Sequence, residues 1–270
     1  MQKNVSTTIG FIGTGNMGAA ILSKLVDITD CKKISIFDID PEKTQSLADL
    51  YSVNIAATIE ELIQKSEYIV LAIKPQILPD ILNHIKNIIE DKVLISIAAG
   101  ISIAQIVSNL KQNVKVIRVM PNTPSLVGEG MSVLSTGENI DEETLNVVKS
   151  IFIGLGRVLI MAEKQMDAVT AVSGSGPAYV FTFIQALIDA GVKLGIPRAE
   201  AGLLAAQTVY GASKMVLEQD ADPITLRNGV TSPGGTTIDA VHVLERAGFS
   251  GIVIDAVQAA FVKSKKLGEA

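Results

Sequence analysis

The sequence predicts an α/β protein in which a doubly wound parallel sheet is followed by a second domain made only of helices. Up to about residue 162, short apolar runs alternate with amphipathic stretches, and a glycine-rich segment joins the first run to the first helix. Strands that alternate with helices form parallel sheets with helices on both faces. Beyond Ala162 the strand-like runs stop. We therefore expect one domain over residues 1–162 and a second over residues 163–270.

The strands expected in the first domain are short apolar runs bounded by turn residues. They are residues 9–12, 34–37, 68–73, 93–97, 114–120, 131–134 and 157–161. Helical spacing of apolar residues predicts the intervening helices at 17–26, 41–50, 59–65, 79–90, 102–110 and 142–154. Asp40, placed before Pro41, and Thr58 are expected to cap the second and third of these helices.

Four further helices are expected in the second domain, at residues 178–194, 198–219, 237–247 and 252–267. Several are apolar on more than one face, and a helix that is apolar nearly all round has to be buried. A domain of this size cannot bury so much apolar surface alone. We expect the excess face to pack against a second copy related by two-fold symmetry. Packing against the first domain is the alternative.

Composition limits the classes of function. The chain has 270 residues, is 48% hydrophobic and carries a formal net charge of −5, which argues against nucleic acid or an anionic membrane as a partner. Cys31 is the single cysteine, so neither an internal disulfide nor a cysteine metal site is expected. The first residues lack a signal-peptide profile and no apolar run has membrane-spanning length. We expect a cytoplasmic protein.

The segment Gly13-Thr14-Gly15-Asn16-Met17-Gly18 has the spacing G-x-G-x-x-G. It follows an expected strand and opens a helix, which is the context that a Rossmann-type dinucleotide site requires. Gly13 permits the tight turn, Gly15 lets the backbone approach a pyrophosphate, and Gly18 lets helix and strand pack closely. The sequence therefore predicts NAD(H) or NADP(H) as cofactor, bound at Gly13, Gly15, Asn16, Met17 and Gly18.

Asp38 follows the second expected strand, where an acidic side chain can bind the 2′-hydroxyl of the adenosine ribose. A carboxylate there repels a 2′-phosphate and favours NADH over NADPH. Alternatively, Asp38 and Asp40 form only a polar turn, and Lys43 offsets part of the repulsion.

Further cofactor contacts are expected after the third and fourth long strands, because ligands of open α/β sheets bind at the carboxyl ends of the strands. Ala99 is small enough to leave room for a nicotinamide ring. Lys74 is either a ligand of a phosphate or ribose, or a solvated loop lysine. The expected contacts at these two strand ends are Ala72, Ile73, Lys74, Pro75 and Ala99.

A second glycine-rich segment, residues 230–237, reads VTSPGGTT and precedes an expected helix. A loop of this kind offers free N–H groups to an anion, and its Ser and Thr residues add hydroxyls. It is predicted to hold a small carboxylate.

Groups typical of acid–base or metal catalysis are not evident in the sequence. The two histidines are expected to be a surface residue, His84, and a packed residue, His242. No zinc-type cluster and no Ser-His-Asp context is recognisable. A reaction that needs little acid–base assistance fits best. Hydride addition to a C=N bond is such a reaction, because a protonated imine is already electrophilic.

Five segments together resemble the pyrroline-5-carboxylate reductase family over essentially the whole chain. They are GTGNMG at 13–18, AIKP at 72–75, MPNTP at 120–124, AVSGSGPAY at 171–179 and VTSPGGTTIDAVHVLE at 230–245. The resemblance implies a Rossmann domain followed by a helical dimerisation domain, NAD(P)H as cofactor, an imino-acid substrate reduced to L-proline, and dimers that often assemble into a decamer.

The resemblance also implies roles for single residues. Thr237 would hydrogen-bond the ring nitrogen as the catalytic hydroxyl, and Glu163 would lie near that nitrogen. The substrate carboxylate and ring would be held by Ser232, Gly235, Thr236 and Thr237. Many family members prefer NADPH and have no acid after the second strand, so Asp38 departs from their pattern.

Two other interpretations stay open from the residues alone. A β-hydroxyacid dehydrogenase or a different imine reductase would need a catalytic lysine in the second domain, where Lys193 and Lys214 are the candidates. A dinucleotide-sensing dimer would bind the cofactor without turnover, but it would have no need of the carboxylate loop.

Overall fold

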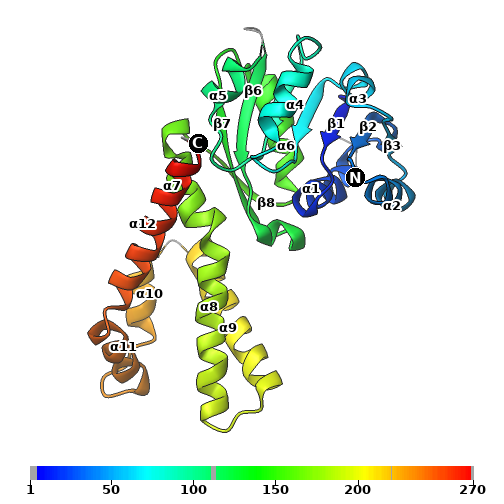
Figure 1. Cartoon of the computed structure of the whole chain (residues 1–270). Helices are drawn as coiled ribbons and strands as arrows, with labels where there is room; N and C mark the ends of the chain where they lie inside the picture. Colours follow the sequence, from blue (N-terminus) through cyan, green and yellow to red (C-terminus); the bar gives the residue numbers. More distant parts are fainter. Residues whose placement is uncertain (1–4, 111–113, 220, 269–270) are drawn as a thin grey trace. The chain divides into compact units, whose positions relative to one another are not determined.

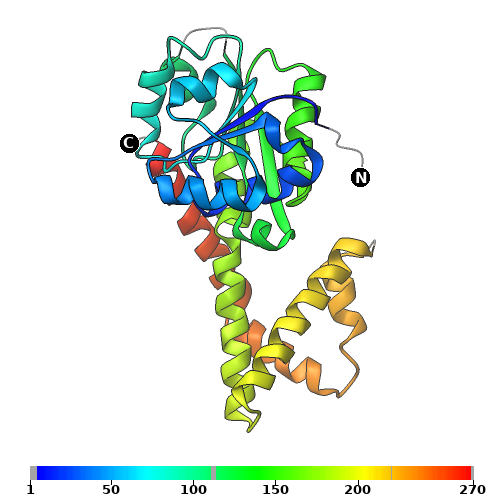
Figure 2. The same ribbon diagram turned by 90° about the vertical axis from the view of Figure 1, so that its right-hand side faces the viewer.

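The computed structural model describes residues 5–110, 114–219 and 221–268. The chain divides into two compact units (Figures 1 and 2). The first unit contains Met1–Ser175 and also Ala260–Ala270, and the second contains Gly176–Ala259. The long C-terminal helix is therefore shared between the units.

An eight-stranded sheet forms the centre of the first unit as far as the structure describes it, with the order β3-β2-β1-β4-β5-β6-β7-β8. The strands are β1 Ile9–Ile12, β2 Ile34–Phe37, β3 Asn54–Ile55, β4 Tyr68–Leu71, β5 Val93–Ser96, β6 Lys115–Met120, β7 Gly130–Thr136 and β8 Gly156–Ile160. Every neighbouring pair is parallel except β6 and β7.

Helices cover both faces of this sheet (Figure 1). Successive strand residues point to opposite faces, so Phe11, Val70 and Ile95 enter one apolar core while Ile69, Leu71 and Leu94 enter the other. The first core is completed by α1 Asn16–Ile28, α2 Pro41–Tyr51 and α6 Glu142–Ile153, and the second by α3 Ile59–Lys65, α4 Leu78–Ile85 and α5 Ile103–Ser108. The predicted doubly wound α/β architecture is confirmed.

The predicted helix caps are also confirmed. The Asp40 carboxylate accepts a hydrogen bond from the Glu42 N–H at 3.2 Å, and the Thr58 hydroxyl accepts one from the Glu61 N–H at 3.2 Å. Each cap satisfies an N–H group that has no partner inside its helix. The sequence thus determined where these helices begin.

Two features of the sheet differ from the sequence prediction. β3 was not predicted, because two residues are too few to show a strand pattern. β7 runs antiparallel to β6, where we expected a parallel strand. The connection between them holds only the short 3₁₀ helix Thr123–Val127, and a parallel crossover needs a longer segment.

In its described residues, 176–219 and 221–259, the second unit contains helices and no strand. They are α8 Gly176–Lys193, α9 Arg198–Glu218, α10 Pro223–Gly229, α11 Thr236–Arg246 and the first part of α12 Phe249–Gly268. α8 and α9 pack closely, since a Cβ on Gly191 would lie 3.1 Å from the Ala201 Cβ. The sequence prediction missed α10, which Asp222 caps and Pro223 begins.

The second unit leaves much of its apolar surface exposed. Among its described residues, Ala201 and Ala205 are the fully buried ones. Phe181 is 61% exposed and Leu203 is 72% exposed. The segment Glu163–Lys193 is also long and apolar enough to cross a membrane, a property that a helix covered by protein can share. Apolar surface of this extent indicates an interaction surface.

Residues 163–175 pack with the first unit, and the start of a second domain at residue 163 stays a prediction. They form the 3₁₀ helix Glu163–Gln165, α7 Met166–Val169 and the π-helical turn Thr170–Gly174. The physical reason is packing: Met166 and Val169 lie in an apolar cluster with Val133 of β7.

Candidate functional site

The strand order places a crevice beside β1. β1 has β2 on one side and β4 on the other, and the chain winds outward in opposite directions from these two neighbours. Ligands of open α/β sheets bind at such a switch point, outside the carboxyl ends of the strands. The loops that follow β1, β2, β4 and β5 are therefore the structural elements of the candidate site.

The three glycines after β1 fit a dinucleotide for different reasons. Gly13 has φ +94°, and a Cβ there would lie 2.5 Å from the Ala72 carbonyl oxygen. A Cβ on Gly18 would lie 2.6 Å from the Gly13 carbonyl oxygen. Gly15 begins α1 without a side-chain cap, and a Cβ on it would meet nothing within 4 Å. The packing of the chain therefore does not require glycine at position 15. A phosphate that approaches the backbone there would require it, because a side chain would occupy its place.

A pocket of about 520 Å³ opens beside this loop, between the beginnings of α1 and α2. It lies on the β2 side of the switch point, where the adenosine half of a dinucleotide binds. Its charged groups are Asp40, Glu42 and Lys43, and the Lys43 ammonium lies 3.2 Å from the Asp40 carboxylate. Its lining residues are Thr14, Gly15, Asn16, Ala19, Asp40, Glu42, Lys43, Ser46 and Leu47.

Asp38 joins the end of β2 to the glycine loop. One carboxylate oxygen accepts hydrogen bonds from the Thr14 N–H at 2.7 Å and the Thr14 hydroxyl at 2.9 Å, and the other accepts the Asp40 N–H at 3.0 Å. Burial by itself would raise the pKa of Asp38, but these hydrogen bonds and the nearby Lys43 ammonium outweigh it and hold the pKa below the usual aspartate range. Asp38 is therefore a charged residue that orders the loop.

This lowered pKa predicts a pH-dependent loss of stability in an Asp38→Asn variant. A group whose pKa is depressed by folding stabilises the protein above its unfolded pKa of about 3.9 and loses that effect as the pH falls below it. We expect the wild type to exceed the variant by about 1–2 kcal/mol in free energy of unfolding at pH 7, and by less below pH ~4. Urea unfolding across this range measures the difference, and a gap that does not change with pH would contradict the prediction.

The remaining residues predicted to bind the cofactor lie at the ends of β4 and β5. Ala72 touches the glycine loop, and the Ile73 Cγ2 lies 2.8 Å from the place of a Gly13 Cβ. Lys74 is exposed, and Ala99 is half-buried in the loop after β5. The structure thus brings the Ala72–Ile73 segment against Gly13 and Gly18.

Asn122 has a structural role that the sequence did not reveal. Its side-chain amide donates to the Ser173 carbonyl at 3.0 Å, and its side-chain oxygen accepts the Met131 N–H at 2.9 Å. Asn122 therefore fastens the π-helical turn to β7. Because both partners lie in other elements of the fold, spacing alone could not have identified them.

The second glycine-rich loop lies in the second unit and opens α11. Gly234 has φ +69°, and a Cβ on Gly235 would lie 2.4 Å from the Ser232 hydroxyl oxygen. Gly235 precedes α11 without a side-chain cap, so the first N–H groups of the helix are free to bind an anion. Thr237 is half-buried, and among the described residues its hydroxyl has no hydrogen-bond partner.

Glu163 lies in the first unit with two protein partners. Its Oε1 accepts the Ile103 N–H at 2.5 Å and lies 3.5 Å from Arg118 Nη1. Arg118 is only 4% exposed, and its Nη2 is buried without a hydrogen-bond partner. The sequence analysis missed Arg118, because β6 places this arginine in a run of otherwise apolar residues. A substrate contact of Glu163 stays a prediction.

The histidines and acidic groups of the described residues form no alternative centre. The His84 imidazole lies 2.6 Å from the Glu60 carboxylate on the surface, as expected, whereas His242 is exposed within its unit and not packed. No group of three or more His, Cys, Asp or Glu that could hold a metal occurs in the described part of the chain.

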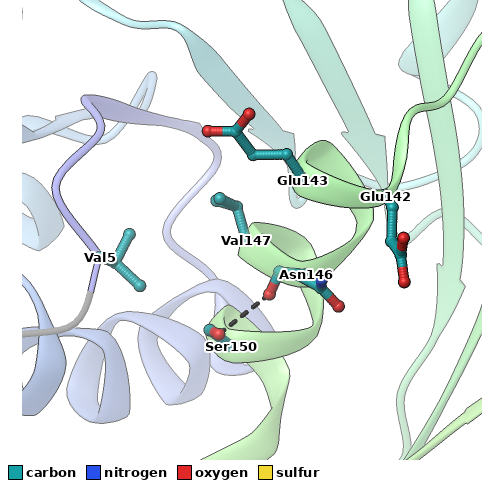
Figure 3. A pocket seen from close by; sticks show the side chains of 6 residues that line it. All are labelled: Val5, Glu142, Glu143, Asn146, Val147 and Ser150. Atoms are coloured by element: carbon teal, nitrogen blue, oxygen red, sulfur yellow. Dashed lines mark hydrogen bonds between the residues drawn. The ribbon is translucent and has the colours of Figure 1, made fainter.

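A further pocket, of about 410 Å³, lies away from the crevice (Figure 3). Figure 3 shows Glu143 and Val147 on the side of α6 that faces the segment containing Val5, with Glu142 on the far side of the helix. Val5 precedes β1, whereas the glycine loop follows it. This pocket therefore lies at the amino end of β1, whereas the predicted cofactor site lies at the carboxyl end.

Comparison with known proteins relates this geometry to a family. Residues 163–267 match the family described as pyrroline-5-carboxylate reductase dimerisation, and residues 8–100 match the family described as NADP oxidoreductase, coenzyme F420-dependent. The pyrroline-5-carboxylate reductase of Escherichia coli is 42% identical over 264 residues, which cover 97% of this chain and 98% of that protein.

Solved structures agree with this relationship. A pyrroline-5-carboxylate reductase from Coxiella burnetii superposes with a TM-score of 0.93 at 34% identity, covering 98% of this chain and 99% of that one. The pyrroline carboxylate reductase of Plasmodium falciparum with NADP bound gives a TM-score of 0.88 at 36% identity, covering 99% and 100%. With these matches along nearly its whole length, the chain belongs to the pyrroline-5-carboxylate reductase family.

Proposed function

We propose that the protein reduces the C=N bond of 1-pyrroline-5-carboxylate with NAD(P)H and releases L-proline, the last step of proline biosynthesis. The observation that carries this proposal is the 42% identity to a pyrroline-5-carboxylate reductase along 97% of the chain. The glycine loop agrees, because Gly15 leaves its side open where a pyrophosphate would approach. In the reaction, the imine carbon gains a hydride, the ring nitrogen keeps the proton of the iminium, and the nicotinamide is oxidised.

In the first unit, the chain's own part in this reaction is binding and orientation. The N–H groups that open α1 bind the pyrophosphate, and the small residues Ala72 and Ala99 leave room at the ends of β4 and β5. The bound reduced nicotinamide supplies the hydride. Lys74, exposed after β4, contributes a positive charge toward a phosphate or ribose.

In the second unit, the loop before α11 holds the imino acid. The substrate carboxylate accepts N–H bonds from Gly235, Thr236 and Thr237 at the start of α11, while the Ser232 hydroxyl adds a polar contact. The Thr237 oxygen accepts the N–H of the protonated ring nitrogen. This hydroxyl keeps the proton on nitrogen and fixes the ring for hydride transfer, so no separate general acid is needed.

We further propose that two chains interleave their helical domains and that five such dimers form a decamer in the cytoplasm. The dimerisation family matched over residues 163–267 supports self-association, and the exposed apolar side chains of α8 and α9 supply the surface. Covering them with a second copy also accounts for the apolarity of Glu163–Lys193 without a membrane.

The test of this function is oxidation of the cofactor in the presence of 1-pyrroline-5-carboxylate, followed by the absorbance of the reduced nicotinamide. We expect turnover with at least one of NADH and NADPH, and proline as the product. A chain that binds the dinucleotide but gives no turnover with this imine would contradict the proposal and favour a sensor.

Asp38 should set the preference between the two cofactors. Its carboxylate lies at the end of β2, beside a pocket that also holds Asp40 and Glu42 and whose Lys43 is paired with Asp40. A 2′-phosphate would therefore meet more negative than positive charge. We expect the wild type to prefer NADH and Asp38→Ser to shift the ratio of kcat/KM values toward NADPH by roughly tenfold, about 1.4 kcal/mol.

Thr14→Val is the matched control for this variant. It removes the hydroxyl that donates to Asp38 but keeps the carboxylate, so it loosens the loop equally for both cofactors. The NADH/NADPH ratio should stay near the wild-type value in Thr14→Val. An unchanged ratio in Asp38→Ser would show that this carboxylate does not discriminate between the cofactors.

A further inference from the structure

The last turns of α12 belong to the first unit and pack against the loop that follows β5, the β5–α5 connection. The Ser264 hydroxyl is buried and donates to the Asp167 carboxylate at 2.7 Å, which ties α12 to α7. In Figure 1 the red C-terminal end of α12 lies next to α7. A segment more than a hundred residues away in sequence thus adjoins the β5–α5 connection.

The contact between α12 and this connection is a backbone contact. Gly100 has φ +79°, and a Cβ there would lie 3.2 Å from the Leu267 Cβ. A Cβ on Gly268 would lie 2.4 Å from the Gly100 carbonyl oxygen. Neither glycine can carry a side chain without displacing the other segment, so the position of one backbone constrains the other.

Gln105 connects the two segments through both ends of its side-chain amide. Its Oε1 accepts the Ser102 N–H at 2.8 Å and the Ser102 hydroxyl at 2.9 Å, forming the capping box of α5. Its Nε2 donates to the Gly268 carbonyl at 2.5 Å. Carbonyls in the last turn of a helix have no partner within the helix, and Gln105 supplies one from the beginning of α5.

The beginning of α5 is held from a second direction as well. The Glu163 carboxylate accepts the Ile103 N–H and lies beside the buried Arg118 of β6. The β5–α5 connection is therefore fixed at its start by β5, and at its end by Glu163 and by the C-terminal turn of α12.

This connection borders the crevice on the side opposite to Asp38. The Ile97 N–H donates to the Leu71 carbonyl at 3.3 Å, so the β5–α5 connection begins beside the last residue of β4. Ala72, which follows Leu71, contacts the glycine loop. With the adenosine half on the β2 side of the switch point, the nicotinamide half extends toward β4 and β5. The loop Ala98–Gly100 follows β5 at this side of the crevice; Ala98 and Gly100 are buried and Ala99 is half-buried.

We propose that the C-terminal turn of α12 positions the loop Ala98–Gly100 against the nicotinamide ring, and that Gln105 is the positioning residue that connects them. This proposal rests on the reductase function proposed above. Hydride transfer depends on the alignment of donor and acceptor, and a misplacement of about 1 Å from a remote change can cost up to a hundredfold in rate. The end of the chain would then be part of the machinery for hydride transfer.

The variant Gln105→Glu isolates this connection. Glutamate keeps the oxygen that accepts from Ser102 and suits the capping box as well as glutamine does. It removes the side-chain N–H that donates to the Gly268 carbonyl, and it places a carboxylate oxygen against that carbonyl oxygen. Gln64→Glu, on the exposed surface of α3, adds the same charge to the same unit and is the matched control.

Three measurements on the full-length protein report on the nicotinamide end of the site, and a fourth, the affinity for ADP-ribose, separates positioning from general damage. In Gln105→Glu we expect kcat to fall roughly tenfold, the kinetic isotope effect with 4-deuterated cofactor to rise, and the nicotinamide fluorescence of bound reduced cofactor to change. ADP-ribose, which lacks the nicotinamide, should bind within about twofold of its wild-type affinity. Gln64→Glu should match the wild type throughout.

Wild-type values of all three quantities in Gln105→Glu would overturn the proposal, and so would a parallel loss of ADP-ribose affinity. If Gln105→Glu does not fold, Ser264→Ala, which loosens the same turn through Asp167, should lower kcat about threefold with normal ADP-ribose binding; an unchanged kcat and fluorescence would refute the proposal. A wild type without turnover contradicts the reductase function instead, and the fluorescence and ADP-ribose measurements still decide the role of Gln105.

Discussion

Replacing Thr237 by alanine is expected to lower kcat/KM for the imino acid roughly ten- to a hundredfold, the scale of one lost hydrogen bond to a charged group. The hydroxyl is half-buried at the start of α11, and it has no partner among the described residues, so it is available to a ligand. Because the bond is made to the reacting nitrogen, we expect a lower kcat as well as a higher KM. Steady-state kinetics with varied imino acid measure both.

Thr237→Ser is the control for that variant. Serine keeps the hydroxyl and removes only the methyl group, so it should recover most of the activity. Wild-type kcat/KM in Thr237→Ala would remove the hydroxyl from the mechanism. Equal losses in the two variants would instead assign the effect to packing of the threonine methyl group.

Replacing Gly15 by alanine is expected to weaken dinucleotide binding about tenfold or more while leaving the fold intact. Gly15 has φ −65°, which alanine adopts freely, and a Cβ there meets no protein atom within 4 Å. The new methyl group lies where the pyrophosphate approaches the backbone. Calorimetric titration with NADH and NADPH measures the affinity, and thermal unfolding without cofactor measures the stability.

Gly18→Ala is the matched comparison, with the opposite expectation for stability. Its Cβ would lie 2.6 Å from the Gly13 carbonyl oxygen, so α1 has to move away from the loop that follows β1, and overpacking of this kind costs about 1–3 kcal/mol. We expect a clear drop in the melting temperature for Gly18→Ala and almost none for Gly15→Ala. Normal dinucleotide affinity in Gly15→Ala would contradict the proposed phosphate position.

Local signals in the sequence predicted much of the fold and one half of the candidate site. The caps at Asp40 and Thr58 could be predicted because a capping side chain accepts its hydrogen bond from an N–H only a few residues away. The glycine motif was readable for the same reason, since its geometry is set by one turn. The strand β3, the helix α10 and the direction of β7 were not, because short elements and antiparallel pairing leave little periodic pattern.

The partners of Asp38 and Glu163 show where sequence reasoning stopped. Asp38 was predicted to contact a ribose, and the structure adds that its carboxylate orders Thr14 of the glycine loop. Glu163 was predicted to lie near the substrate, and the structure gives it Arg118 and Ile103 as partners. Each of these contacts joins residues from different elements.

By itself, the sequence determined the doubly wound sheet, the helix starts and the glycine turn after β1, since each depends on periodicity or on groups a few residues apart. Only the tertiary structure decided that residues 163–175 and the end of α12 join the first unit, and that Gln105 reaches Gly268. The reason is that these contacts are selected by packing between distant segments. Their free energy depends on the complementary surfaces that meet, and no local pattern in the chain records which surfaces those are.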